Sequence, residues 1–182
     1  MQQFNTWTLD AIRSEGASLN WLEESRFEWG GATLQAIRKI LESKTIILIT
    51  DDDRKWLEHY IMDAINKLSN ERPMVPIVCL DKLYPNFDRI TGGEMIDMLE
   101  DMLTLSFKGE YFFWYIGKGD DKRADIAKRD DNSYLWIMDE DFVNAVSLKS
   151  YDKKIDIKLL QLYALFDATF NAALFGEIDT DE

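Results

Sequence analysis

Cysteine and histidine are almost absent from this chain of 182 residues, which contains one of each. The single Cys79 excludes an internal disulfide, and together with His59 it is too little to build a zinc site from cysteine and histidine ligands. His59 projects onto the polar side of its predicted helix, so we interpret it as an exposed residue rather than the base of a catalytic group. Cys79 lies in an apolar run and is interpreted as a small buried hydrophobe. With no signal peptide either, a cytoplasmic protein is predicted.

Positive charge is also scarce, with 21 lysine and arginine residues against 34 aspartate and glutamate residues and a net charge of −13. Nucleic acids and anionic membranes attract basic surfaces, so neither is expected as a direct partner. Long apolar runs are missing as well. The most apolar window, residues 159–175, carries Gln161, Asp167 and Asn171 and is too short and too polar to span a bilayer.

Glycine-rich phosphate-binding motifs are missing, because neither G-x-G-x-x-G nor G-x-x-x-x-G-K-[ST] occurs. The apolar run 46–49 predicts a buried parallel strand, and ligands bind at the carboxyl ends of such strands. Three aspartates, residues 51–53, follow this strand, and their negative charge repels phosphate. We therefore expect no sugar phosphate as ligand. The segment 117–119, Gly-Lys-Gly, also follows a predicted strand, but two aspartates come next and we interpret it as a turn.

Apolar strand-like runs alternate with helical stripes along the chain, which predicts an α/β fold: three layers, α/β/α, with a five-stranded, mostly parallel sheet. Pro76 lacks an N–H group and places its strand at an edge or at a strand entry. We expect one domain over residues 1–182, with N-terminal helices in 1–44 and a frayed acidic tail in 176–182. Strands are predicted at 46–49, 75–80, 111–116, 134–138 and 145–148, and helices at 4–15, 19–43, 56–68, 93–105 and 155–175, with a short helix or loop at 120–128.

Two glycines, Gly30 and Gly31, interrupt the long predicted helix at 19–43. Each costs roughly 1 kcal/mol of helix stability relative to alanine. Gly30 projects onto the same face as Leu34 and Ile37, which indicates a close contact with another helix, within the chain or between subunits. A kink at this point is the alternative.

The last predicted helix, 155–175, is apolar almost all the way round. Leu159 and Phe166 lie on one face, whereas Leu165, Ala168 and Ala172 lie on the opposite one. A helix on the protein surface keeps a broad polar face, so we expect this helix to be buried on both sides. The sheet covers one side, and another subunit or a partner protein covers the other. Burial by the long second helix of the same chain is the alternative.

Acidic side chains follow two of the predicted strands. They are Asp51, Asp52 and Asp53 after the first, and residues 139–141, Asp-Glu-Asp, after the fourth. At the carboxyl edge of a sheet their oxygens, those of Asp51 and Asp53 above all, suit Mg²⁺, as in a receiver-like or phosphohydrolase-like domain. A receiver needs more than the 30 residues between Asp51 and Asp81. Capping of a helix N-terminus accounts for the aspartates without a metal.

Five motifs, in the same order and spacing, resemble the HobA family over nearly the whole chain. They are Trp21-Leu22-Glu23 with Arg26 and Trp29, Asp51-Asp52-Asp53-Arg54-Lys55-Trp56, Phe113-Trp114-Tyr115-Ile116-Gly117-Lys118, Ser133-Tyr134-Leu135-Trp136, and Lys158-Leu159-Leu160-Gln161-Leu162.

This resemblance implies a fold similar to that of sugar isomerase (SIS) domains and of DiaA, without isomerase activity. HobA proteins bind the N-terminal domain of the replication initiator DnaA, promote its assembly at the chromosomal origin, and are homotetramers. The resemblance therefore implies a non-enzymatic adaptor that needs no cofactor. Sugar isomerase domains carry a serine- and glycine-rich phosphate loop where this chain has aspartates, as expected of a scaffold that lost phosphate chemistry.

The resemblance also implies two partner-binding residues. In relatives of the DiaA type a Leu-Phe pair near the C-terminus touches the initiator, and Leu174-Phe175 match that pair in residue type and place. Packing in the core or between subunits is the alternative role for both. No residue is assigned to catalysis or to a metal.

Overall fold

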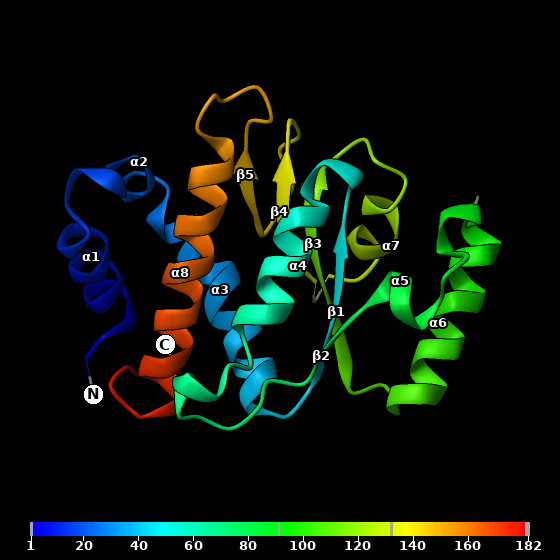
Figure 1. The fold of residues 1–182 in the computed structure, drawn as a ribbon, viewed down its shortest axis with the longest axis horizontal. Helices are drawn as coiled ribbons and strands as arrows, with labels where there is room; N and C mark the ends of the chain where they lie inside the picture. The colour runs from blue at the N-terminus through cyan, green and yellow to red at the C-terminus, as the bar shows by residue number, and fades with distance from the viewer. Residues whose placement is uncertain (1, 91, 132, 181–182) are drawn as a thin grey trace.

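The computed structural model describes residues 2–90, 92–131 and 133–180. A five-stranded sheet forms its centre, and each pair of neighbouring strands is parallel (Figure 1). The order β2-β1-β3-β4-β5 places β2 at an edge, as predicted from Pro76 at its start. The strands are β1 (Thr45–Thr50), β2 (Ile77–Cys79), β3 (Tyr111–Lys118), β4 (Tyr134–Met138) and β5 (Ala145–Leu148).

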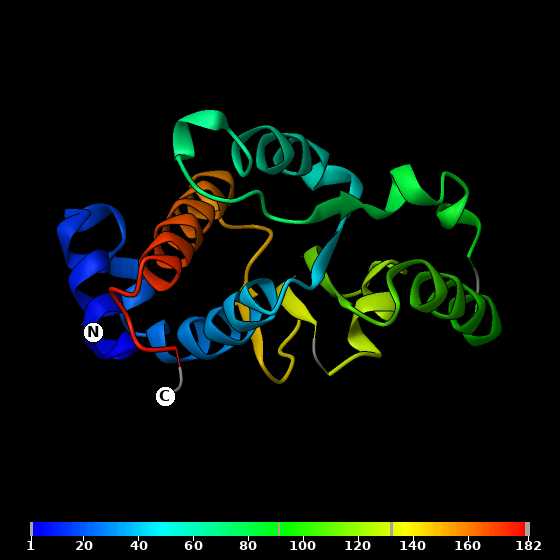
Figure 2. The ribbon, with the colours of Figure 1, turned by 90° about the horizontal axis from the view of Figure 1, so that it is seen from below.

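Helices cover both faces of the sheet, which confirms the predicted α/β class. One face carries α3 (Arg26–Leu41), α4 (Lys55–Ala64) and α8 (Ile155–Leu174), and the other carries α5 (Leu80–Leu83), α6 (Gly93–Phe107) and α7 (Ala124–Lys128). A further layer lies outside the first face, where α1 (Phe4–Ser14), with α2 (Asn20–Glu23) beside it, packs on α3 and α8 (Figures 1 and 2). Short 3-10 helices span Gly16–Ser18, Asp52–Arg54, Leu68–Asn70 and Phe87–Arg89.

Successive residues of β1 alternate between two apolar clusters, one on each face. Ile46 and Leu48 pack with α3, α4 and α8, whereas Ile47 and Ile49 pack with α5, α6 and α7. Because both faces are covered, the whole run is buried, as parallel strands require. Aromatic rings of β3 and β4, those of Phe112, Trp114, Tyr134 and Trp136, belong to the first cluster. There the ring centroid of Trp114 lies 4.8 Å from that of Phe166 on α8.

The helix predicted over 19–43 is two helices, because the chain breaks at Glu24 and Ser25 rather than at the glycines. The guanidinium of Arg26 donates to the carbonyl of Glu23 at 2.7 Å, and so occupies a carbonyl that a continuous helix uses internally. The prediction of one continuous helix is therefore wrong.

Other predicted ends also differ, and the strand predicted at 75–80 begins only at Ile77. The helix after β1 ends at Ala64 instead of reaching Leu68, which is 98% exposed. The side-chain amide of Asn70 donates to the carbonyls of Ala64 and Ile65 at 3.1 Å each and caps the helix there. The strand predicted to reach residue 80 ends at Cys79, because Leu80 begins α5.

Gly30 lies at a close contact within the chain. It is buried in the unbroken α3, and a Cβ added to it would lie 3.0 Å from Cε1 of Phe4 on α1. The predicted helix–helix contact is confirmed, its partner being a side chain of α1. Gly31 faces open space.

The chain itself buries most of α8. Leu165 and Ala172, which were assigned to the face opposite Leu159, are 4% and 2% exposed, because α1, α3 and α4 all pack on this helix. For these residues the structure supports the alternative of burial within the monomer. Two other residues of α8, Ala164 and Ala168, remain exposed.

The acidic tail is docked as far as Thr180, so the prediction that it frays is wrong for the described part. Gly176 adopts a left-handed φ of 72° after α8 and turns the chain back. Ile178, only 2% exposed, forms a parallel bridge with Gln2, and the guanidinium of Arg38 donates to the carbonyl of Thr180. Burial of the apolar Ile178 side chain therefore holds the tail in place, although the residues around it are mostly polar. Residues 181 and 182 lie outside the described residues.

Among the described residues, each helix is too short or too polar to cross a lipid bilayer.

The two glycines of α3 make a matched test of this packing. Gly31→Ala is expected to raise the free energy of unfolding by about 0.5–1 kcal/mol, because alanine favours the helix and meets no neighbour. Gly30→Ala is expected to lose this gain, since its new methyl group crowds Phe4. Urea unfolding of both variants measures the difference, and equal gains would contradict the close contact.

Candidate functional site

The carboxyl edge of the sheet, where the sequence predicts a ligand crevice, is organised around the buried carboxylate of Asp51 at the end of β1. Its Oδ2 accepts the backbone N–H of Lys118 at 2.9 Å, and its Oδ1 accepts the N–H of Arg54 at 3.1 Å. The Arg54 guanidinium lies 3.1 Å from Oδ2, with both side chains 5% exposed. Burial raises the pKa of Asp51, while the Lys118 N–H and Arg54 oppose this shift.

Gly117 shows how closely this carboxylate fits. A Cβ at Gly117 would lie 2.9 Å from the Asp51 carboxylate and 2.5 Å from the hydroxyl of Tyr115. The chain thus places its own anion against a backbone N–H group at the carboxyl edge of the sheet, where parallel α/β proteins bind their ligands. The segment 117–119 was predicted as a turn, but Gly117 and Lys118 belong to β3, and the turn begins at Gly119.

The other two aspartates of this loop are exposed and paired. Asp52 accepts a hydrogen bond of 2.8 Å from Arg123, which also binds Asp121 at 2.9 Å. The Arg123 guanidinium lowers the pKa of Asp52. Asp53 lies 3.0 Å from Arg54. The predicted capping role is confirmed for Asp51, which caps the 3-10 helix at Asp52–Arg54.

The second acidic cluster, after β4, is separated from the first by β3. Glu140 forms an ion pair of 2.6 Å with Lys128, and Asp139 accepts the backbone N–H and the hydroxyl of Ser150. Asp139 and Glu140 thus each have a partner from their own chain. The hypothesis that both clusters join in an Mg²⁺ site therefore lacks the required geometry among the described residues.

We expect Mg²⁺ at about 10 mM, compared with EDTA, to shift the melting temperature by less than roughly 1 °C. An ion bound at a hundred times its dissociation constant adds about 2.7 kcal/mol, which corresponds to a shift of roughly 5–10 °C for a chain of this size. A thermal melt followed by circular dichroism distinguishes the two outcomes.

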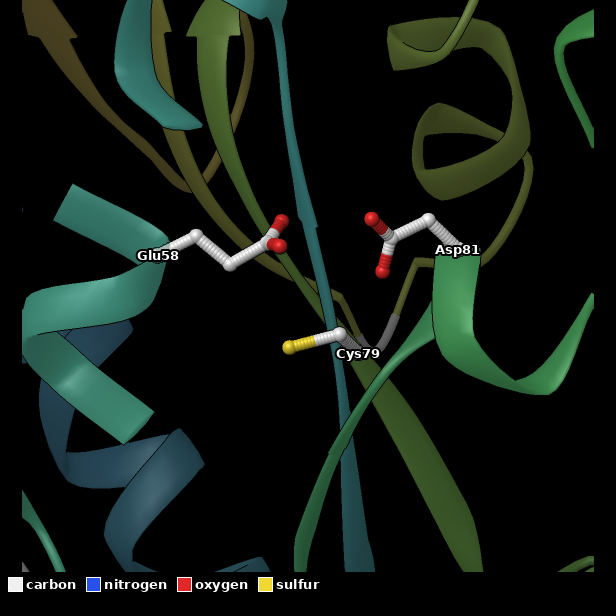
Figure 3. Close-up of side chains that lie close together, drawn as sticks. All are labelled: Glu58, Cys79 and Asp81. Carbon is white, nitrogen blue, oxygen red and sulfur yellow. The ribbon is translucent and has the colours of Figure 1, made fainter. Parts of the chain in front are cut away.

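A different group gathers beneath this edge, where Glu58 of α4, Cys79 of β2 and Asp81 of α5 point toward a common space (Figure 3). Their ligand atoms lie within 4.8 Å of one another, which suits a metal ion. The ammonium of Lys55, however, already binds this space, at 2.8 and 2.9 Å from the two oxygens of Glu58 and 2.9 Å from Asp81. Thr50 donates a further hydrogen bond of 2.9 Å to Glu58. The single ammonium of Lys55 therefore pairs with both carboxylates and offsets one of their two negative charges.

Cys79 is unsuited to nucleophilic chemistry in this setting. Burial and the neighbouring carboxylates of Glu58 and Asp81 raise the pKa of its thiol to about 12. The interpretation as a buried hydrophobe is confirmed, and His59 is exposed, as predicted. Sequence reasoning missed the role of Glu58, although its spacing of three residues from Lys55 is a signal for an ion pair on one helix face.

Replacement of Lys55 tests this pairing. Lys55→Met is expected to lower the free energy of unfolding by about 2 kcal/mol or more, because it leaves the buried Glu58 without an ion-pair partner and removes the nearer of the two lysines at Asp81. Lys82 also approaches Asp81, at 3.6 Å, but its side chain is 72% exposed. The matched variant Lys82→Met should therefore change stability by no more than about 0.5 kcal/mol. Similar losses in urea unfolding of both would contradict the assigned role.

The two residues predicted to bind a partner lie at the end of α8 in different environments. Phe175 is 61% exposed, whereas Leu174 is half-buried and packs against the apolar cluster of α1, α3, α4 and α8. Leu174 thus packs partly within its own chain, whereas most of the Phe175 side chain faces solvent.

Sequence reasoning missed an open groove between α1 and α8, with a volume of 510 Å³. The exposed Ala164 and Ala168 line one side, and Trp7 and Ala11 line the other. Alanines four apart on an otherwise bulky helix were the available signal.

Comparisons with known proteins agree on one family. The family model described as HobA, DNA replication regulator, matches residues 1–180. The DNA replication regulator protein HobA of Helicobacter pylori is 26% identical over 186 residues, covering 98% of this chain and 99% of that protein. Two crystal structures from Helicobacter pylori cover the same shares: a HobA–DnaA (domain I–II) complex, with a TM-score of 0.74 and 24% identity, and HobA, with 0.75 and 23%. They share the fold of this chain.

Proposed function

The chain belongs to the HobA family of DNA replication regulators, and from this premise we propose that it binds the N-terminal domain of DnaA and promotes DnaA assembly at the chromosomal origin. The observation that carries the proposal is the family match over residues 1–180, together with a relative of the same fold that was crystallised with domains I–II of DnaA.

The proposed role is that of a non-enzymatic adaptor. Its support is the carboxyl edge of the sheet, where Asp51 takes the backbone N–H of Lys118 and leaves it unavailable to a phosphorylated substrate. The net charge of −13 supports binding to a protein rather than to DNA, because it repels DNA and attracts basic patches.

The adaptor is proposed to act as a cytoplasmic homotetramer. One body that holds several DnaA molecules raises their effective concentration to roughly millimolar and favours ordered assembly. Apolar side chains exposed on one helix support self-association, since soluble monomers rarely keep a large apolar patch uncovered. On α6 these side chains are Met95, Met98, Met102 and Leu105.

Phe175 and its neighbour Leu174 are proposed as part of the DnaA contact. The Phe175 side chain is 61% exposed, so a partner can bury much of its apolar surface. The loss of conformational entropy is small, because the side chain has only two rotatable bonds. Leu174 supports it from the core side and is expected to contribute mainly by holding the end of α8.

Phe175→Ala is expected to weaken binding of the DnaA N-terminal domain at least fivefold, about 1 kcal/mol, because an interface aromatic is removed. Phe27, which is 58% exposed on α3, is the matched control, and Phe27→Ala should leave the affinity unchanged. Isothermal titration calorimetry measures both. Equal affinity in the Phe175 variant would remove this residue from the contact.

Light scattering at micromolar concentration measures the oligomeric state. A mass of four times 21.3 kDa is expected for the wild type and for both phenylalanine variants. A monomer would contradict the multivalent mechanism while leaving binding of DnaA itself open to the calorimetric test.

A further inference from the structure

The groove between α1 and α8 has an apolar floor and is open along the outer layer of the molecule. Both ribbon views place α1 alongside α8, and the two helices are in contact (Figures 1 and 2). The apolar lining residues of its 510 Å³ are Trp7, Ala11, Leu19, Ala164, Leu165 and Ala168.

The exposed face of α8 extends this groove in both directions. Ile157, Ala164, Ala168 and Phe175 are seven, four and seven positions apart and project within about 20° of one direction at 3.6 residues per turn. The large side chains at the two ends, Ile157 and Phe175, are 56% and 61% exposed, and the two alanines lie between them. A second hollow of 440 Å³ adjoins Ile157 and shares Ser18 and Gln161 with the first. At 1.5 Å per residue the stripe is about 27 Å long, which matches a partner helix.

The polar groups around the groove are mostly bound within the chain. Gln161 accepts a hydrogen bond of 3.0 Å from the indole of Trp21 and donates one of 3.0 Å to the carbonyl of Ser18. Ser14 and Ser18 each donate to a carbonyl three residues earlier, at 2.8 Å. A small-molecule site needs a few convergent polar groups, and this lining has few to offer.

Two carboxylates remain on the α1 side. Asp10 accepts a hydrogen bond of 3.0 Å from Gln2 but forms no ion pair within the described residues, and Glu15 has no ion-pair partner there either. Asp10 and Glu15 are the charged residues that line the 510 Å³ groove, and both are negative, whereas the adjoining hollow is lined by Asp152, Lys154 and Lys158. The electrostatic complement is a partner with lysine or arginine beside its apolar stripe.

We infer that this groove is the docking site for an amphipathic helix of a different protein, which inserts an apolar stripe between α1 and α8 and sets basic residues against Asp10 and Glu15. The mode is that of a helix in a groove, in which small residues on the floor let the partner approach closely.

A second copy of this chain fits the groove less well. Its exposed apolar helix, α6, contains no lysine or arginine and four acidic residues, so it would bring negative charge to Asp10 and Glu15. Docking across a two-fold axis would also place a second pair of these carboxylates at the same interface. The inference rests on the proposed function, because the helix is taken to belong to DnaA.

The test uses the full chain and the DnaA domain I–II protein in calorimetry. Ala164→Glu and Ala168→Glu fill the groove with a charged side chain at exposed helical positions that tolerate glutamate. Each is expected to weaken binding about tenfold or more. Leu68→Glu, at a 98% exposed position beyond the end of α4, adds the same charge outside the groove and should leave affinity unchanged.

Charge reversal is the second arm. Glu15→Lys is expected to weaken binding about threefold to tenfold at low salt, and less at high salt, because the lost attraction is screened. Asp125→Lys on α7 is the control with the same change in charge and should have no effect beyond the general loss of negative charge. Light scattering and circular dichroism accompany every variant.

The outcomes separate the two proposals. If the wild-type chain fails to bind DnaA, the proposed function fails and the inference with it. If the wild type binds and the alanine variants bind equally well, only the groove assignment is overturned. If these variants keep their fold but lose the oligomeric state of the wild type, the groove is an interface between copies, and the inference is overturned in favour of self-association.

Discussion

The hydrogen bonds of the Asp51 carboxylate join the two central strands at their functional edge. They link the end of β1 to the end of β3 through Lys118 and cap the first turn of the next helix through Arg54. A buried carboxylate is stable only with such partners, so the loop after β1 and the end of β3 are held in one conformation. Gly117 is required there because any side chain would collide with this carboxylate.

Filling this edge from within changes what the α/β scaffold can do. The crevice in which proteins of this architecture hold phosphorylated ligands is closed by an internal ion pair, and beneath it Lys55 forms ion pairs with Glu58 and Asp81. Side chains that remain free to bind a partner lie elsewhere, on the outer helices. The added α1 layer is therefore the part of the fold that creates new surface, and its groove against α8 lies on the opposite side of α8 from the sheet.

Much of the fold could be predicted because its signals are local. The run Ile46–Ile49 needs only its own composition to indicate a strand covered on both faces, and Pro76 needs only its missing N–H to indicate an edge. The errors arose where a side chain overrides a local pattern. Asn70 caps α4 before the apolar stripe reaches Leu68, and Ile178 docks a tail whose composition is acidic. Neither contact can be read from periodicity, because each depends on the folded position of its partner.

The sequence by itself determined the parallel α/β class, the acidic charge, the inert cysteine and the family, because each depends on residue identity or short-range order. Only the tertiary structure decided that Asp51 binds Lys118, 67 positions away, that Phe175 is exposed while Leu174 is packed, and that α1 and α8 leave a groove between them. These features require knowing which distant segments meet. Burial and pairing are properties of that arrangement rather than of the residues that take part in it.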